Sequence, residues 1–212
     1  MDNQPEIHPD TTPDAKTAAI VDAAQRIFLA KGFDGASMDA IALAANVSKR
    51  TVYNRFRSKE ELFGATIEET CRRVLPVNLA EAEVTQNPRE FIETLARSFL
   101  KGILEPEAIS LRRIATFEAG RKPELGQSYL EHGLYFMIDA GSEILARIAA
   151  RGDIVRTPNP RLAICQLGAL ITEPLYSEVL LGKTPENLDS AIERQLQTGL
   201  DAFWQLFGVA AE

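Results

Sequence analysis

The sequence predicts an all-α protein of about nine helices. Apolar residues recur every three or four positions along most of the 212 residues, which is the spacing that places them on one face of a helix. Ser or Thr precedes several of these segments as a helix start, and Gly or Pro follows them as an end. No segment alternates apolar and polar residues between hairpin turns, as strands would. We therefore expect helices throughout, with no repeat of fixed period.

The first expected helix follows a short polar arm. Residues 1–11 contain two prolines among polar residues, and we expect them to be disordered. Thr12 and Pro13 are the residue types preferred at a helix start, and Gly32 stands where a glycine commonly ends a helix. The apolar positions between these ends are Ala19, Ile20, Ala23, Ala24, Ile27 and Phe28.

Residues 37–56 predict two short helices joined by a tight turn. Ser37 and Ser48 can each accept a hydrogen bond from a backbone amide and so begin the two helices. Asn46 falls in the turn, and asparagine tolerates left-handed backbone angles. The inward positions of this unit are expected to be Ile41, Val47, Val52 and Phe56.

A fourth helix is expected from Ser58 to about residue 75. Ser58 and Glu61 have the spacing of a capping box, in which each side chain bonds the backbone amide of the other residue. Pro76 should stop this helix, because proline lacks the amide hydrogen that a helix interior needs.

The remaining sequence is helical as well. A long segment from Pro123 to Arg151 is interrupted mildly by two glycines, and a loop over residues 152–160 follows it. Pro174 should kink the next helix, and the last helix is expected from about Pro185 to Phe207.

Charge is distributed unevenly along the chain. Five cationic residues between Val47 and Lys59 stand without any Asp or Glu among them: Lys49, Arg50, Arg55, Arg57 and Lys59. Setting aside those five charges from the formal net charge of −7 leaves −12 for the remaining residues. A local basic helix on an acidic chain suits contact with a polyanion at one place. The alternative is a solvated charged face, which many helices have.

Other classes of site find little support. The two cysteines, Cys71 and Cys165, are far apart in apolar helical settings, so we expect buried, reduced thiols and no disulfide. Two Cys and two His at unrelated spacings suggest no metal site, and no catalytic set or cofactor motif is present. The longest apolar run, near Leu162 to Ile171, is too short to cross a membrane. We expect a cytoplasmic protein.

Three short helices with a tight turn before the third have the geometry of a helix-turn-helix, whose second helix enters the major groove of DNA. Lys49 and Arg50 lie in the first turn of that helix, where they can reach phosphates or a guanine edge. Residues 14–74 closely resemble the DNA-binding domain of the TetR family of bacterial transcriptional regulators. The resemblance rests on AAIVDAAQRIFLAKGFDGASMDAIALAANVSKRTVYNRFRSKEELF, which includes Gly32-Phe33 and the series Tyr53, Phe56, Lys59, Glu60, Leu62 and Phe63.

The resemblance implies two domains. Residues 12–75 would form the DNA-binding domain and residues 77–212 a helical domain for ligand binding and dimerisation, with the last two helices pairing with those of a second copy. Family members often have Gly where this chain has Asn46. Together, the residues and the resemblance place these side chains at the DNA: Ser37, Ser48, Lys49, Arg50, Thr51, Tyr53, Asn54, Arg55 and Lys59.

A ligand site is expected in the helical domain. Residues 112–136 mix aromatic and polar side chains among apolar ones and are similar to AefR-type C-terminal domains. Aromatic residues at helical spacing are more often core than pocket, and His132 also suits a surface position. The candidate ligand residues are Arg113, Phe117, Tyr129, His132, Phe136, Glu173 and Tyr176.

These expectations combine into one function. Together with the resemblance, the sequence predicts a homodimer that binds a palindromic double-stranded DNA operator and is not an enzyme. The resemblance implies that it is a repressor, which holds the operator until a small-molecule inducer binds. The alternatives are a helical protein-interaction module and an enzyme with no role at DNA.

Overall fold

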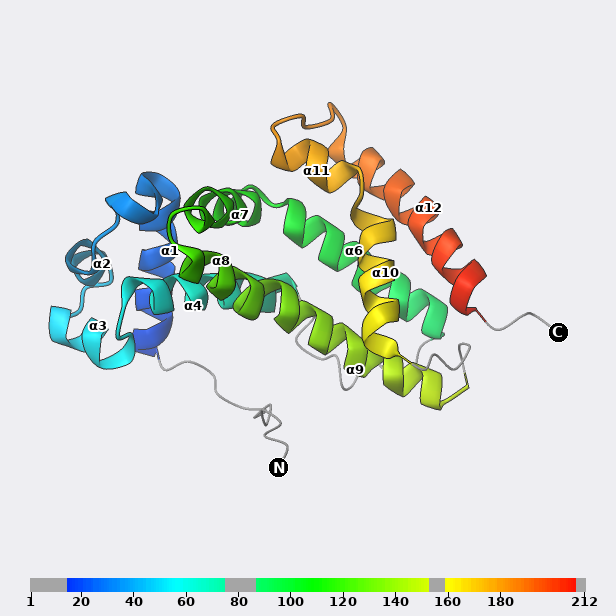
Figure 1. Ribbon diagram of the computed structural model, residues 1–212, viewed down its shortest axis with the longest axis horizontal. Helices are drawn as coiled ribbons and strands as arrows, with labels where there is room; N and C mark the ends of the chain where they lie inside the picture. Colours follow the sequence, from blue (N-terminus) through cyan, green and yellow to red (C-terminus); the bar gives the residue numbers. More distant parts are fainter. Residues whose placement is uncertain (1–14, 75–86, 153–158, 209–212) are drawn as a thin grey trace.

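The computed structural model describes residues 15–74, 87–152 and 159–208, and all of its regular structure there is helical (Figure 1). The helices are α1 (Ala15–Gly35), α2 (Met38–Ala44), α3 (Lys49–Arg55), α4 (Lys59–Val74), α6 (Pro88–Leu104), α7 (Pro106–Ala119), α8 (Pro123–Tyr129), the π-helical segment η1 (Leu130–Tyr135), α9 (Phe136–Ala150), α10 (Pro160–Thr172), α11 (Leu175–Leu180) and α12 (Leu188–Phe207). Counting α8, η1 and α9 as one continuous helix, the described residues form ten helices, and the all-α prediction is confirmed.

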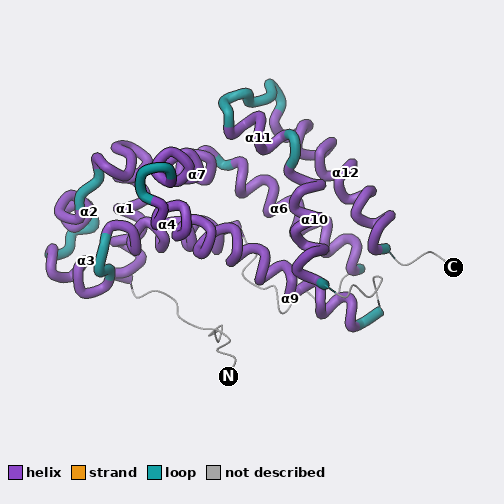
Figure 2. The backbone as a smooth tube through the Cα atoms, viewed as in Figure 1, coloured by secondary structure: helices purple, strands orange, loops and turns teal. Residues whose placement is uncertain are grey.

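The chain is elongated, with α2 and α3 at one end and α12 at the other (Figure 1). The connections within the described ranges are short, so consecutive helices lie close together (Figure 2). The predicted arm over residues 1–11, the helix start at Thr12 and Pro13, the stop at Pro76 and most of the loop at 152–160 lie outside the described residues.

The helix starts predicted at Ser37 and Ser48 and the turn predicted at Asn46 are confirmed. The Ser37 hydroxyl accepts from the Ala40 amide at 3.2 Å, and the Ser48 hydroxyl accepts from the Thr51 amide at 3.0 Å. Asn46 has a positive φ of 53°. Gly32 leaves the helical conformation, with φ 70° and ψ 178°, where the sequence predicts the end of α1. A single further turn follows it before Gly35.

One of the two hydrogen bonds predicted for the capping box at the start of α4 is confirmed, and the other is wrong. The Ser58 hydroxyl accepts from the Glu61 amide at 3.1 Å, as predicted. The Glu61 carboxylate accepts from the Arg57 amide at 2.7 Å and not from that of Ser58. The carboxylate of Glu61 therefore bonds the amide one residue earlier than predicted. It still places a negative charge at the N-terminus of α4, which is the positive end of the helix dipole.

Pro174 ends a helix instead of kinking it. The Glu173–Pro174 peptide is cis, and Glu173 has an extended backbone, as a residue before proline prefers. Two helices, α10 and α11, replace the single one predicted, which accounts for the additional helix. The last helix begins at Leu188, later than predicted, because the Asn187 side chain caps it by accepting from the Ser190 amide at 2.9 Å.

Two clusters of buried apolar side chains form the core. The first, which we call the N-terminal core, joins α1–α4 to Leu111 and Ala115 of α7 and Leu125 of α8. At its centre, the rings of Phe28, Phe33 and Phe63 contact one another with centroids 5.2–5.7 Å apart. The second, the C-terminal core, joins α6, α9, α10, α11 and α12. The helix α7 contributes to both, because its Ile109 belongs to the C-terminal core.

The cysteine prediction is corrected in part. Both thiols are free, but Cys165 is exposed and Cys71 is half-buried, so neither is fully buried as expected. Burial raises the pKa of the Cys71 thiol to about 11. None of the described helices is long and apolar enough to cross a membrane.

Candidate nucleic-acid interface

The helix α3 is fixed by its inward face. Ile41 of α2 and Val52 of α3 are fully buried, and Phe56 is nearly so. Val47, predicted to face inward, is half-buried and packs against the same core. Because one side of α3 is bound to the N-terminal core, the opposite side is held facing solvent.

Four predicted contacts form the outward face of α3. Lys49, Arg50, Tyr53 and Asn54 are all exposed. The Lys49 ammonium lies 2.8 Å from the Asp39 carboxylate and 5.8 Å from the centroid of the Tyr53 ring. The hydrogen bond with Asp39 raises the pKa of Lys49, so this cation is both positioned and charged. The role of Asp39 was missed, because ten residues separate it from Lys49 and nothing in the sequence indicates the contact.

The predicted hydroxyl contacts have structural partners. Ser37 and Ser48 both cap helices, and the Ser48 and Thr51 hydroxyl oxygens are 2.8 Å apart. These bonds satisfy amides at the starts of α2 and α3. Amides at a helix start that remain free of such caps can bind phosphate groups.

Arg55 and Lys59 are engaged with the protein itself. The Arg55 guanidinium donates to the Thr17 hydroxyl of α1 at 2.7 Å. The Lys59 ammonium donates to the carbonyl oxygens of Phe33 and Ala36 at 2.7 and 2.9 Å, and it lies over the Phe33 ring. An ammonium has three protons to donate, so one remains. A DNA contact by Lys59 stays a prediction.

Three of the predicted ligand residues are exposed on the surface. Arg113 donates to the carbonyl oxygens of Leu180 and Val179 at 2.9 and 3.0 Å, and so closes the end of α11. Phe117 is 71% exposed. Glu173 is also exposed, and its carbonyl oxygen accepts from the Gln195 side chain at 2.7 Å.

Two others, Tyr129 and Tyr176, are brought together with Arg112. Tyr129 packs against the N-terminal core and Tyr176 against the C-terminal core. Burial raises the pKa of both phenols, and the nearby Arg112 opposes the increase in each. Arg112 itself was missed, since the sequence offers no reason to prefer it to the adjacent Arg113.

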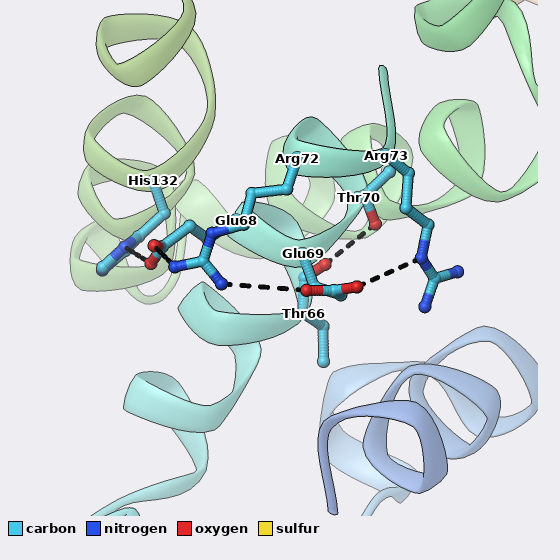
Figure 3. Close-up of polar contacts among 7 residues, drawn as sticks. All are labelled: Thr66, Glu68, Glu69, Thr70, Arg72, Arg73 and His132. Carbon is cyan, nitrogen blue, oxygen red and sulfur yellow. Dashed lines mark hydrogen bonds and ion pairs between the residues drawn. The ribbon is translucent and has the colours of Figure 1, made fainter. Parts of the chain in front are cut away.

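The remaining two, His132 and Phe136, lie on the continuous helix Pro123–Ala150. Phe136 is half-buried. His132 is paired with Glu68 of α4, with Nδ1 3.3 Å from the carboxylate oxygen (Figure 3). Glu68 also pairs with Arg72, and Arg73 lies 3.3 Å from Glu69 further along α4.

A cavity of about 510 Å³ lies where α4, α6 and α7 meet. Its lining mixes apolar and charged side chains: Thr70, Arg73, Val74, Ser98, Lys101, Gly102, Glu105, Glu107 and Ala108. Its size suits a drug-sized molecule. None of the seven predicted ligand residues is among those that line it.

The fold and the outward face of α3 define a helix-turn-helix protein with a larger helical body. Residues 20–66 match the family described as bacterial regulatory proteins, tetR family. Residues 90–209, more than half of the chain, match the AefR-like transcriptional repressor C-terminal domain. The chain therefore belongs to the TetR family of transcriptional regulators, a family whose members are not enzymes.

Solved structures support this assignment over nearly the whole chain. A TetR-family transcriptional regulator from Mesorhizobium loti MAFF303099 is 28% identical with a TM-score of 0.79. The flavonoid-responsive regulator FrrA is 31% identical with a TM-score of 0.71. Each comparison covers 94% of this chain and 100% of the other.

A curated protein is similar over part of the sequence. The HTH-type transcriptional regulator BetI of Rhizobium meliloti (strain 1021) is 32% identical over 108 residues, 50% of this chain and 53% of that protein. The chain thus spans about half the length of this curated relative.

Proposed function

We propose that the protein is a cytoplasmic, homodimeric repressor that binds a palindromic operator through α3 and releases it when a small molecule binds the helical body. The observation that carries the proposal is the outward face of α3. Lys49, Arg50, Tyr53 and Asn54 are exposed there on a helix whose other side is buried. Cation, phenol and amide groups are the ones that contact phosphates and base edges in the major groove.

We infer dimerisation from the short length of α3, the helix that we assign to the major groove. The seven residues of α3 reach only a few base pairs, so two copies related by a twofold axis are needed for useful specificity. The helices α10 and α12 pack against each other and expose apolar side chains. Leu162 is 53% exposed and Leu206 is 63% exposed. We assign this surface to the dimer, in which both side chains would be covered.

Response to a small molecule is supported by the arrangement of the cores and by similarity. The helical body joins the DNA-binding helices through α7 and α8, which contribute to the N-terminal core. A ligand in the body can therefore change the spacing of the two α3 helices, provided that it binds the two spacings with different affinity. The similar FrrA is described as flavonoid-responsive.

The DNA half of the proposal is tested by fluorescence anisotropy with the DNA upstream of the gene itself and of its neighbours. Replacing Lys49, Arg50 or Tyr53 with Ala should each weaken specific binding by about tenfold or more, with folding and dimerisation retained. Lys183→Ala is the matched control, because it removes an exposed cation far from α3. If Lys49→Ala and Tyr53→Ala bind as the wild type does, the assignment of α3 is wrong.

Salt dependence gives a second measurement on the same samples. Each phosphate neutralised by a cation releases counterions, so the affinity should fall steeply as salt increases. Arg50→Ala should reduce the slope of log affinity against log salt by about one, whereas Lys183→Ala should leave it unchanged.

Analytical ultracentrifugation of the wild type and Leu206→Glu tests the dimer. The substitution places a charge on the α10–α12 surface and should therefore weaken self-association.

A further inference from the structure

Arg112 of α7 is half-buried, and its guanidinium lacks a full set of hydrogen-bond partners. Its Cζ atom is 4.8 Å from the centroid of the Tyr129 ring, which covers one face of the cation. Its Nε atom is buried and has no hydrogen-bond partner among the described residues. A buried N–H of a permanent cation is unfavourable without a hydrogen-bond partner, and an acceptor bound at this position would supply one.

Two acidic side chains of α7 and α4 already have partners of their own. Glu118 of α7 is buried and pairs with Arg121 at 3.1 Å. Glu68 of α4 pairs with His132 and Arg72. No ion pair joins Arg112 to a carboxylate in the described parts of the chain. The guanidinium of Arg112 is therefore available to pair with an external anion.

The surroundings of Arg112 are those of a ligand's polar anchor. Tyr129 and Tyr176 are both half-buried and near this cation, so phenolic hydroxyls and a guanidinium gather beside apolar side chains of the two cores. We call Arg112, Tyr129 and Tyr176 the arginine–tyrosine cluster. Pockets that bind small molecules are built in this way, from apolar walls and a few convergent polar groups.

A cavity lies one helical turn away. Ala108 lines the cavity of about 510 Å³, and it precedes Arg112 by four residues, on the same face of α7. Thr70, which also lines the cavity, is adjacent to Cys71, and Cys71 is near enough to Tyr129 to raise the pKa of that phenol. The lining of the cavity thus comes within one helical turn of Arg112 along α7.

We propose that the arginine–tyrosine cluster anchors the carboxylate of a small apolar acid whose body extends toward this cavity. Arg112 would bind the carboxylate through paired, charge-assisted hydrogen bonds, and the tyrosine hydroxyls would donate to the remaining lone pairs. The proposal rests on the regulator function proposed above and adds the chemical class of the inducer. Since Tyr129 belongs with one core and Tyr176 with the other, a carboxylate held by both would sense their relative position.

The test uses 4-bromobenzoate as the probe and its neutral analogue 4-bromobenzamide as the matched ligand. Isothermal titration calorimetry of the full chain should show binding of the acid and at least tenfold weaker binding of the amide. Arg112→Gln should reduce the affinity for 4-bromobenzoate by about tenfold or more. Arg26→Gln is the control, because it removes an exposed cation of α1 that pairs with Asp22 and lies outside the cluster, and it should leave the affinity unchanged.

Two further measurements keep the result clear. Tyr176→Phe retains the ring and removes only the hydroxyl, and it should reduce the affinity for 4-bromobenzoate severalfold. This variant tests the site even if Arg112→Gln folds poorly. In crystals soaked with the acid, the anomalous signal of bromine should place the carboxylate against Arg112. Equal binding of acid and amide, no effect of either variant, no binding at millimolar acid, or bromine at another place would each overturn the proposal.

Anisotropy with operator DNA separates this proposal from the function on which it rests. If wild type binds its operator and Tyr53→Ala does not, but the acid fails to bind, only the acid site is wrong. If the acid binds at Arg112 and the wild type shows no specific DNA binding, only the repressor function is wrong.

Discussion

Glu68 and His132 join α4 to the π-helical segment η1, with His132 Nδ1 3.3 Å from the carboxylate oxygen (Figure 3). The two helices can approach this closely because residue 64 is glycine. A Cβ atom there would lie 2.6 Å from His132 Cδ2 and 2.7 Å from the Ser128 hydroxyl. The pair therefore links the helix that follows the helix-turn-helix to the helical body.

This pair should make stability depend on pH. The hydrogen bond with Glu68 raises the pKa of His132 above its usual 6.5, and the hydrogen bond with His132 lowers the pKa of Glu68 below its usual 4.5. The His132 contribution is complete below pH 6.5 and is lost as pH rises through the raised pKa. The Glu68 contribution is present above pH 4.5 and is lost as pH falls through the lowered pKa. The pair should thus stabilise most between about pH 4.5 and 6.5.

Denaturant unfolding of the wild type and Glu68→Gln across this range measures the effect. The difference should be below about 1 kcal/mol, because both side chains are partly exposed, and it should shrink above the raised pKa of His132. Glu69→Gln is the control, since Glu69 pairs with Arg72 and Arg73 but not with His132. A difference between wild type and Glu68→Gln that stays constant from pH 5 to 9 would contradict this role.

Lys59→Met should destabilise the DNA-binding helices. It leaves the carbonyl oxygens of Phe33 and Ala36 without the ammonium that they accept from, and we expect a loss of about 1–3 kcal/mol. Arg57→Met, at an exposed neighbouring cation, should change stability by less than about 0.5 kcal/mol. Chemical denaturation checks both. Weakened operator binding by a Lys59 variant of unchanged stability would indicate instead that its third proton reaches a phosphate.

Asn46 should tolerate glycine and reject alanine. At its φ of 53° a Cβ is unfavourable, and Asn lowers that strain through its short polar side chain. Asn46→Ala should therefore cost about 1 kcal/mol, whereas Asn46→Gly should be close to neutral. Thermal unfolding of the two variants checks the order. Equal stability of Ala and Gly at this position would show that the turn relaxes when it is substituted.

The local features of the first 60 residues could be predicted because they depend on neighbours in sequence. A serine cap needs an amide three residues later, and a turn needs an Asn at one position. Glu61 shows the limit of such reasoning, because its carboxylate had two amides within reach and bonded the earlier one. Pro174 shows a second limit. A proline can either kink a helix or end it, and the sequence does not distinguish the two outcomes.

The long-range part of the site could not be predicted. Arg113 looked equivalent to Arg112, but the turn of α7 points one to the end of α11 and the other to Tyr129. The contact between Glu68 and His132 spans 64 residues and depends on the packing of two helices. Only the tertiary arrangement shows which of these polar side chains meet.

The crossing of α10 and α12 should not tolerate a side chain at Gly199. A Cβ atom there would lie 2.5 Å from the Leu170 carbonyl oxygen and 2.7 Å from its carbon, and backbone atoms cannot move aside as a flexible side chain can. Gly199→Ala should therefore destabilise by about 1–3 kcal/mol. It should also weaken the dimer, because we assign the surface of these two helices to it.

Gly168→Ala is the matched control on α10. A Cβ atom at Gly168 meets nothing within 4 Å, so alanine there should gain up to about 1 kcal/mol of helix stability. Denaturant midpoints measure the stability of both variants, and sedimentation measures their association. The two substitutions add the same methyl group to facing helices, so helix propensity favours both and only the contact with Leu170 opposes one. If Gly199→Ala is as stable as Gly168→Ala and equally dimeric, the close approach of α12 to the Leu170 carbonyl is not present in solution.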